Sequence, residues 1–364
     1  MNLKELLNTN KLERIGRTYI ENDKLFMNFS GSGVRLMVSG DVVSLKLFAT
    51  NHSCDRNRPY ISVFLNDNRE DFPLTEEINN IKIKLPEGIS ELRVCKRTEA
   101  SVSYAALCDL VVDNVYDLPE EKKLNLEFYG DSITCGFGNL TNNPEEPFTS
   151  KTESFFNGYA YLTTKALNAR YSAISVSGFP IYKSRWNEGF AIESVGDMLS
   201  LASYCDDYTL ETAPKWDNKL YQPDIVVINL TSNDDSYFTE GQNWVDELLK
   251  ELKSMDKVIE TEIFKERLNG LYNRIQRFFD ELFDMYGKDL KIVWAVGTMY
   301  LHEPVMKTLE DAIHDYNNPN VYHTYFDSWS DSTDRGAVWH PGAKMHINAA
   351  NDLVEFIKNK VLGE

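Results

Sequence analysis

An apolar run in the chain stops at Gly130, and the polar pair Asp131 and Ser132 follows it in the segment YGDSITCGFGN. A serine is a weak nucleophile until a base takes its proton, and that base is usually a histidine within hydrogen-bond reach. Among six histidines, His340 has the most suitable setting, because AVWHPG lies between the last predicted strand and the last predicted helix. The two residues together predict nucleophilic attack on an acyl group.

An acyl-transfer site also needs hydrogen-bond donors for the oxyanion, each worth roughly 3–4 kcal/mol. Three donors follow apolar strands: the backbone N–H groups of Ser132 and Gly178, and the side-chain amide of Asn233 in INLTSNDD. Alone, each motif is more often a turn or a helix cap. Their order, each at the end of a predicted strand, favours a catalytic site. His346 lies inside the last predicted helix and is expected to be a packing or surface residue.

The elements that would hold these residues fall into two parts with different rhythms. From about residue 11 to 112 the chain runs in short stretches with period-2 apolar spacing, β-branched residues and frequent turn signals. This pattern is typical of an all-β sandwich or jelly roll, which we expect over residues 1–116. The charged segment DLPEEKK, residues 117–123, is predicted to be a linker.

The rest of the chain, 124–364, alternates apolar strands with helices. Strands are predicted at 124–130, 171–178, 223–230, 290–298 and 320–329, and helices at 154–170, 264–287 and 342–359. Such alternation implies a parallel sheet covered on both faces. Reactive groups in these folds gather at the carboxyl ends of the strands, where the sequence places Ser132, Gly178 and Asn233.

Composition limits the kinds of partner. The chain has 364 residues and a formal net charge of −18, which disfavours nucleic acid and anionic membranes because phosphate binding needs a basic face. No apolar stretch approaches a membrane span, and MNLKELLNTNKLERIGR lacks the apolar core of a signal peptide. Five cysteines without CxxC spacing argue against structural zinc and for a reduced compartment. We therefore expect a cytoplasmic protein without a nucleic-acid or membrane partner; a homo-oligomer stays open.

The motifs resemble those of SGNH, or GDSL-type, hydrolases, and the match to carbohydrate esterase family 2 is closer still. YGDSITCGFGN at 129–139 is the longest match, and NGYAYL, SVSG, PDIVVINL with Asn233 and Asp234, and His340 with Pro341 follow in order. The resemblance covers essentially the whole chain. It implies an N-terminal jelly roll, a C-terminal three-layer SGNH domain with a flavodoxin-like parallel sheet, and a carbohydrate O-acetylesterase of the acetyl xylan esterase type without a metal or organic cofactor.

In that family pattern Ser132 is the nucleophile and His340 is the base. The oxyanion hole is formed by the N–H groups of Ser132 and Gly178 and by the Asn233 side chain. The third motif here reads TSND and lacks its usual glycine, and the loop FPIYKSRW after Gly178 also departs from the family. Asp131 adjoins the serine, but we expect it to accept turn N–H groups and not to reach His340.

The triad acid is the largest departure from the pattern. Family members usually carry an aspartate three residues before the base, and here that residue is Ala337. Two alternatives could orient His340. A nearby carboxylate, Asp334 or Asp331, could replace the usual aspartate, or a backbone carbonyl near Val338 could accept the hydrogen bond of Nδ1. We slightly favour the carbonyl, which gives a Ser-His dyad.

Aromatic residues gather near these motifs, and sugar rings stack on aromatic faces. The set comprises Phe137, Tyr182, Trp186, Phe238, Trp329 and Trp339. Any single one is more often half-buried scaffold. Trp339 and Trp186 flank the proposed catalytic loops, and with Tyr182 they are the predicted substrate contacts. The resemblance implies that the substrate is an acetylated plant-type oligosaccharide, of the xylo- or manno- type, and that the enzyme removes its acetyl groups.

Two other functions stay open. An SGNH thioesterase or lysophospholipase would need a long apolar groove for a fatty acyl chain, and the loops here are polar and acidic. A catalytically inactive carbohydrate-binding relative would have no need for serine, histidine and asparagine in register. The sequence does not decide whether the β-domain contacts the substrate.

Overall fold

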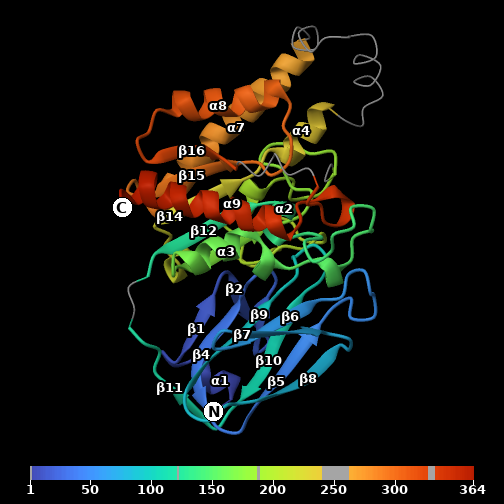
Figure 1. The fold of residues 1–364 in the computed structure, drawn as a ribbon, viewed down its shortest axis with the longest axis vertical. Helices are drawn as coiled ribbons and strands as arrows, with labels where there is room; N and C mark the ends of the chain where they lie inside the picture. The colour runs from blue at the N-terminus through green and yellow to red at the C-terminus, as the bar shows by residue number, and fades with distance from the viewer. Residues whose placement is uncertain (1, 121–122, 187–188, 240–261, 327–332) are drawn as a thin grey trace.

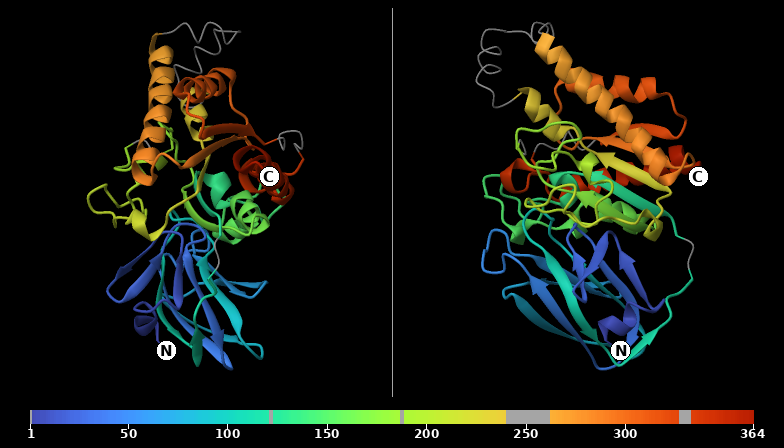
Figure 2. Two further views of the ribbon diagram at one scale, coloured as in Figure 1. Left: turned by 90° about the vertical axis from the view of Figure 1, so that its left-hand side faces the viewer. Right: turned by 180° about the vertical axis from the view of Figure 1, so that it is seen from behind.

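The computed structural model describes residues 2–120, 123–186, 189–239, 262–326 and 333–364. Two antiparallel sheets form one end of the molecule, and a parallel sheet between helices forms the other (Figure 1, Figure 2). Within the described residues no helix combines the length and the apolar character needed to cross a membrane.

The first part of the chain forms two antiparallel sheets that share one core. The first sheet has the order β1 (Leu12–Ile15), β4 (Gly33–Ser39), β9 (Ser90–Lys96), β6 (Tyr60–Leu65), β7 (Asn68–Pro73), with β11 (Asn114–Tyr116) paired to β4. The second has the order β2 (Thr18–Glu21), β3 (Lys24–Met27), β10 (Ala105–Val111), β5 (Val42–Ala49), β8 (Ile78–Lys84). Alternate Leu, Val and Ile side chains fill the space between the sheets, and α1 (Leu3–Leu6) adds two leucines to this core. The sandwich that the period-2 pattern predicts is therefore present.

The second part contains a five-stranded parallel sheet. Its order is β13 (Arg170–Ser175), β12 (Asn125–Gly130), β14 (Ile225–Asn229), β15 (Lys291–Val296), β16 (Val321–Tyr325). Alternate strand residues face opposite layers: Val226 and Ile228 pack towards α7 (Glu262–Tyr286) and α8 (Glu303–Tyr316). Val227 packs towards the opposite layer, which contains α3 (Tyr159–Ala166) and α9 (Ala343–Phe356).

Several predicted boundaries move. The helix expected over 154–170 is a 3-10 turn at Phe155–Asn157 followed, after Gly158, by the shorter α3. The last helix continues beyond α9 as a π-helix at Ile357–Leu362. The end of the strand expected at 320–329 lies outside the described residues. Helix α8 is absent from the predicted elements, although its apolar residues follow helical spacing.

A buried arginine joins the two parts. The Arg17 side chain comes from the sandwich, is fully buried, and donates to the carbonyls of Met198, Leu199 and Leu201 at 2.8–3.0 Å. It also forms an ion pair of 3.3 Å with Glu127 in β12. A buried guanidinium is stable only when it is paired and hydrogen-bonded, so this contact fixes the sandwich against the parallel sheet.

Candidate active site

Ser132 lies two residues after the end of β12, at the edge of the sheet where the sequence predicts it. The strand ends at Gly130, where a Cβ atom would lie 1.9 Å from Oγ1 of Thr134, so only glycine fits. Asp131 then caps the short helix α2 (Ser132–Cys135), because its carboxylate accepts from the N–H of Ile133 at 3.0 Å. This contact confirms the turn-holding role expected for Asp131.

His340 reaches the serine. Its Nε2 atom lies 2.9 Å from Oγ of Ser132, and its Nδ1 atom lies 3.1 Å from the carbonyl oxygen of Val338. A carbonyl oxygen can only accept, so Nδ1 carries the proton. Nε2 is then unprotonated and can accept the hydroxyl proton of Ser132. The structure therefore pairs Ser132 with a histidine that a backbone carbonyl orients, which is the geometry expected of a Ser-His dyad.

The turn before His340 has an unusual backbone. Val338 and Trp339 have φ angles of 50° and 61°, in the left-handed region that non-glycine residues rarely adopt. The turn is held by the segment that follows α2, because the N–H groups of Ala337 and Val338 donate to the carbonyls of Gly138 and Glu146 at 3.1 and 3.2 Å. This strained turn points the Val338 carbonyl at the imidazole ring.

Asp334 has a different partner. Its carboxylate accepts from the backbone N–H of Met345 at 2.7 Å, in the first turn of α9. That contact satisfies one of the free N–H groups at the helix start. Asp334 therefore caps a helix here, and the hydrogen bond of Nδ1 goes to Val338 instead. Asp331, the other carboxylate considered, lies outside the described residues.

The surroundings of His340 favour its neutral form. Burial lowers the pKa of this imidazole to about 4, opposed by its hydrogen bond to Val338 and reinforced by the nearby charge of Arg335. The ring of Phe137 packs on the imidazole with centroids 4.1 Å apart, and Phe148 stacks behind it at 4.0 Å. Phe137 thus has an identifiable contact in the site: it covers one face of the base and excludes water from it.

Two other histidines have structural partners. His346 is fully buried, and its Nδ1 accepts from the N–H of Tyr159 at 3.2 Å, which confirms the packing role. His302 lies 2.8 Å from a carboxylate oxygen of Asp235, a pairing that the sequence did not indicate.

Asn233 links the two segments that carry the other predicted oxyanion donors, Ser132 and Gly178. Gly178 has a φ of 82°, a conformation that glycine adopts without strain. The Nδ2 atom of Asn233 donates to the Asp131 carboxylate at 3.0 Å and to the carbonyl of Phe179 at 3.2 Å. The Asn233 amide therefore ties the nucleophile turn to the loop after Gly178, and one of these bonds must give way before it donates to an oxyanion. Its donor role stays a prediction.

Two buried carboxylates, which the sequence reading missed, hold this loop. Asp234 accepts from the N–H groups of three successive residues, Ile181, Tyr182 and Lys183, at 2.7–3.1 Å. Burial raises the pKa of Asp234 to about 7. The sequence signal for Asp234 was its position next to Asn233 in the third motif, but only the asparagine was assigned a role there.

Glu99, the second carboxylate, comes from the sandwich. It follows β9, is buried, and accepts from the backbone N–H of Ser177 at 2.7 Å and from the Ser177 hydroxyl at 2.6 Å. Ser177 precedes Gly178, so a residue of the β-domain positions a proposed oxyanion donor. Cys135 and Glu153 complete a buried cluster here. Burial, with the Glu99 charge nearby, raises the pKa of Glu153 well above its usual value.

The predicted aromatic contacts divide into two groups. Trp186 and Trp339 are 58% and 56% exposed, and they lie beside Gly178 and His340 respectively. Exposed indole rings beside Gly178 and His340 fit the predicted stacking role. Tyr182 instead packs against Gly270 of α7 and the hydrophobic core. Trp329 lies outside the described residues.

Residues 14–119 match the family model "Carbohydrate esterase 2 N-terminal". The chain is 29% identical over 282 residues to "Cellulase/esterase CelE" of Acetivibrio thermocellus, which covers 76% of this chain but only 31% of that protein. It is 27% identical over 290 residues to an "Acetylxylan esterase / glucomannan deacetylase" of Cellvibrio japonicus, covering 76% of this chain and 71% of the relative.

Solved structures agree with these matches. A family two carbohydrate esterase from Clostridium thermocellum, in complex with cellohexaose, superposes with a TM-score of 0.78 and 24% identity over 97% of this chain and 100% of that one. At that identity the likeness concerns the fold. Together, the sequence and structural matches identify the chain as a relative of carbohydrate esterase family 2.

Proposed function

We propose that this chain is a serine esterase that removes acetyl groups from acetylated oligosaccharides. The observation that carries the proposal is the 2.9 Å contact between Oγ of Ser132 and Nε2 of His340, with Nδ1 of His340 held by the Val338 carbonyl. The names of the curated relatives support the substrate class, and xylo- or manno-oligosaccharides are the proposed backbones.

The proposed reaction has two acyl-transfer steps. Oγ of Ser132 attacks the acetyl carbonyl while His340 takes the hydroxyl proton, and the N–H groups of Ser132 and Gly178, with Asn233, stabilise the oxyanion. The intermediate collapses when the imidazolium protonates the departing sugar oxygen, which leaves acetyl-Ser132. A water molecule, deprotonated by His340, then attacks the acyl-enzyme and releases acetate.

A carbonyl in place of the triad carboxylate changes one part of this chemistry. It fixes the tautomer of His340, but it stabilises the imidazolium only as a dipole and not as a charge. In a serine protease, replacing the triad acid so that the tautomer is wrong costs about 10⁴ in kcat. The Val338 carbonyl accepts from Nδ1 and so avoids that cost, which supports a functional dyad.

We further propose that the chain divides into a jelly-roll domain at 1–116, a linker at 117–123 and an SGNH domain at 124–364. Every strand of the two antiparallel sheets precedes residue 117, and every strand of the parallel sheet follows residue 124. From β3 to β10, the strand orders β4-β9-β6-β7 and β3-β10-β5-β8 support the jelly-roll connectivity. The five unpaired cysteines support the proposed cytoplasmic location.

Acetate release from acetylated xylo-oligosaccharides and from p-nitrophenyl acetate tests the proposal. Ser132→Ala should abolish release from both substrates, while Ser44→Ala, on β5 of the sandwich, should retain the wild-type rate. Wild-type protein that released no acetate from either substrate, or Ser132→Ala protein that kept the wild-type rate, would contradict a serine esterase.

Saccharide binding without catalysis is the second candidate, and the exposed Trp186 and Trp339 favour it. It predicts quenching of tryptophan fluorescence by oligosaccharides with no acetate release. An esterase would show both, and its Ser132→Ala variant would keep the quenching alone.

A further inference from the structure

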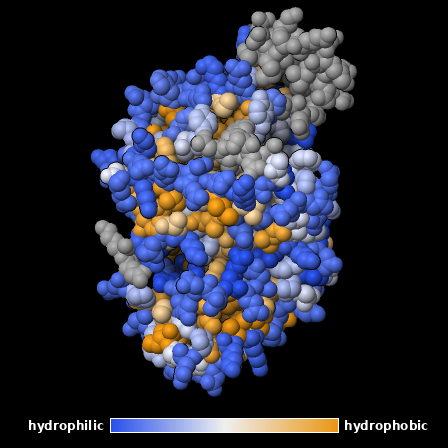
Figure 3. Space-filling model, in the orientation of Figure 1, coloured by the Kyte–Doolittle hydropathy of each residue, from blue (hydrophilic) through white to orange (hydrophobic). Residues whose placement is uncertain are grey.

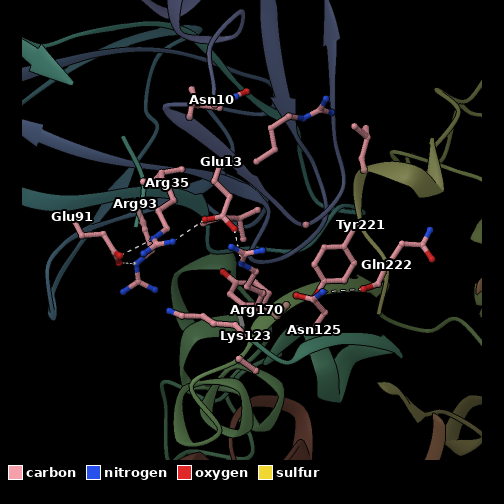
Figure 4. Close-up of a pocket in the computed structure, with 18 of the residues that line it drawn as sticks. Asn10, Glu13, Arg35, Glu91, Arg93, Lys123, Asn125, Arg170, Tyr221 and Gln222 are labelled. Carbon is pink, nitrogen blue, oxygen red and sulfur yellow. Dashed lines mark hydrogen bonds and ion pairs between the residues drawn. The ribbon is translucent and has the colours of Figure 1, made fainter. Parts of the chain in front are cut away.

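A cavity of about 520 Å³ lies where the sandwich meets the parallel-sheet part. In Figure 3 the surface is hollowed at this junction. Glu13 of β1, Arg35 of β4 and Arg93 of β9 line it from the sandwich, and Lys123, Asn125 and Arg170 line it from the other side. Figure 4 shows the cationic ends of Arg35, Arg93, Lys123 and Arg170 gathered in one region of the pocket.

The lining is positively charged, in contrast to the protein as a whole. It contains five cations, which are Arg14, Arg35, Arg93, Lys123 and Arg170. Its only anions are Glu13 and Glu91, so the described lining has an excess of three positive charges. The complete chain has a net charge of −18. A cationic concavity on an acidic protein focuses an attractive potential for anions at that place.

The two carboxylates are shared among three guanidinium groups. Glu13 lies 3.0 Å from Nη1 of Arg35 and 3.0 Å from Nε of Arg170. Glu91 lies 2.6 Å from Nε of Arg35 and 3.1 Å from Nε of Arg93. In the described part of the chain, no hydrogen bond from the Nη atoms of Arg170 is found, and this side chain is 40% exposed. A guanidinium fork therefore stays available for a planar or tetrahedral oxyanion.

The cavity is separate from the dyad. Asn125 and Arg170 are the first residues of β12 and β13, whereas Ser132 lies two residues beyond the last residue of β12. Six strand residues at about 3.3 Å each put roughly 20 Å between the two places. An anion bound here would therefore not occupy the acyl site.

We propose that this interdomain cavity binds a small organic anion, a sugar-sized molecule that carries a carboxylate or a phosphate group. The volume lies in the usual range of ligand pockets. The guanidinium groups recognise the anionic group, while Asn125 and Gln222 offer amides for hydroxyls, and the rings of Tyr171 and Tyr221 offer apolar faces.

A second cavity of about 400 Å³ adjoins the first and shares with it the cations Arg93 and Lys123, the anion Glu91 and Tyr171. It adds the cations Arg69 and Lys165 and the single anion Asp67. The positive character therefore continues along the junction, which leaves room for a ligand longer than one sugar unit.

Isothermal titration calorimetry of the full chain tests the proposal with three probes of similar size: D-glucuronate, D-glucose 1-phosphate and neutral D-glucose, all at matched ionic strength. At least one anion should bind, and glucose should not. The stronger of the two anions identifies the carboxylate or the phosphate as the preferred group. Ser132→Ala protein should bind as the wild type does, because the acyl site is not involved.

Arg170→Gln should weaken anion binding about tenfold or more, since it removes the available guanidinium. Arg277→Gln is the matched control, because that arginine also pairs with one glutamate through Nε, at 3.5 Å, but lies on α7. Lys123→Gln serves as a second variant if Arg170→Gln does not fold. Absence of heat with both anions, binding of glucose equal to that of the anions, or equal anion affinity in the Arg170 and Arg277 variants would each overturn the proposal.

Discussion

The contact between Glu99 and Ser177 predicts that a residue of the sandwich controls turnover at the proposed oxyanion hole. Glu99→Ala removes both hydrogen bonds to Ser177, of 2.7 and 2.6 Å. Hydrogen bonds to a charged group contribute about 1.5–3 kcal/mol each. Without them, the backbone N–H of Gly178, the residue that follows Ser177, is no longer held where the oxyanion forms.

The size of the effect is bounded by the structure. Complete loss of one oxyanion donor costs about 10²–10³ in kcat. The loop keeps its second anchor, since Asp234 still binds the N–H groups of Ile181, Tyr182 and Lys183. We therefore expect Glu99→Ala to lower kcat about 10- to 100-fold and to change KM little. In Glu99→Gln the amide oxygen still accepts from the Ser177 N–H, and the amide NH₂ can donate to the Ser177 hydroxyl, so we expect most of the rate to return.

Steady-state kinetics with p-nitrophenyl acetate, alongside thermal unfolding, measures both quantities. Arg69→Gln is the control, because its Nη2 donates to Asn157 at 2.8 Å across the same junction without touching the Gly178 loop. That variant should keep its kcat. If Glu99→Ala lowered the unfolding temperature but left kcat at the wild-type value, Glu99 would be only structural and the reasoning would be refuted. A fall in kcat in Glu99→Gln as large as that in Glu99→Ala would also count against it, because the amide keeps the hydrogen bonds.

Three further predictions follow from the base and its turn. The proposed mechanism needs neutral His340, and the pKa of this residue is lowered to about 4. The ratio kcat/KM should therefore stay constant down to about pH 5 and fall through about pH 4. A fall near pH 6.5, about the ordinary pKa of histidine, would contradict this. Asp334→Asn should keep kcat within about threefold, because an asparagine also caps the helix. Asp334→Ala should lose about 1 kcal/mol of unfolding free energy in urea titrations, with little change in kcat. A roughly 10³-fold loss of kcat in folded Asp334→Asn would instead identify Asp334 as the triad acid. Val338→Gly should raise the unfolding free energy by about 1 kcal/mol, because it removes the backbone strain of a valine in the left-handed conformation. The same change should lower kcat severalfold, because the turn that orients His340 becomes more flexible. An unchanged kcat would show that catalysis does not depend on the rigidity of this turn.

Features that depend on local spacing could be predicted from the sequence. The strand that ends at Gly130, the serine after it and the histidine before the last helix all follow from patterns within ten residues. The contact of His340 with the Val338 carbonyl was foreseeable for the same reason: with alanine at position 337, an acceptor two residues before the base is available within the turn itself.

Features that depend on burial and on distant contacts could not be predicted. Glu99 and Ser177 are 78 residues apart and follow strands of different sheets, so no local pattern pairs them. Tyr182 is of a residue type that often contacts sugars, but its ring packs on Gly270 of α7. The hydrogen bonds from the backbone N–H groups of this loop to Asp234 determine where the loop runs. Helix α8 was missed since its apolar residues are mixed with five charged ones in the segment EPVMKTLEDAIHDY.

Because Nδ1 of His340 bonds to a backbone carbonyl, these long-range contacts gain a functional meaning in the proposed mechanism. A carboxylate attracts the imidazolium through charge, whereas the Val338 carbonyl orients His340 only while the backbone turn keeps its shape. That turn is bonded to Gly138 and Glu146, which lie in the segment between α2 and α3. The same segment is bonded to the sandwich, where the backbone N–H of Ser150 donates to the Arg56 carbonyl at 2.8 Å. Glu99 fixes the oxyanion loop to the sandwich as well. We therefore expect geometric restraint from the sandwich to do part of what an orienting charge does in a triad, and we expect catalysis to need the sandwich even if it never touches the substrate.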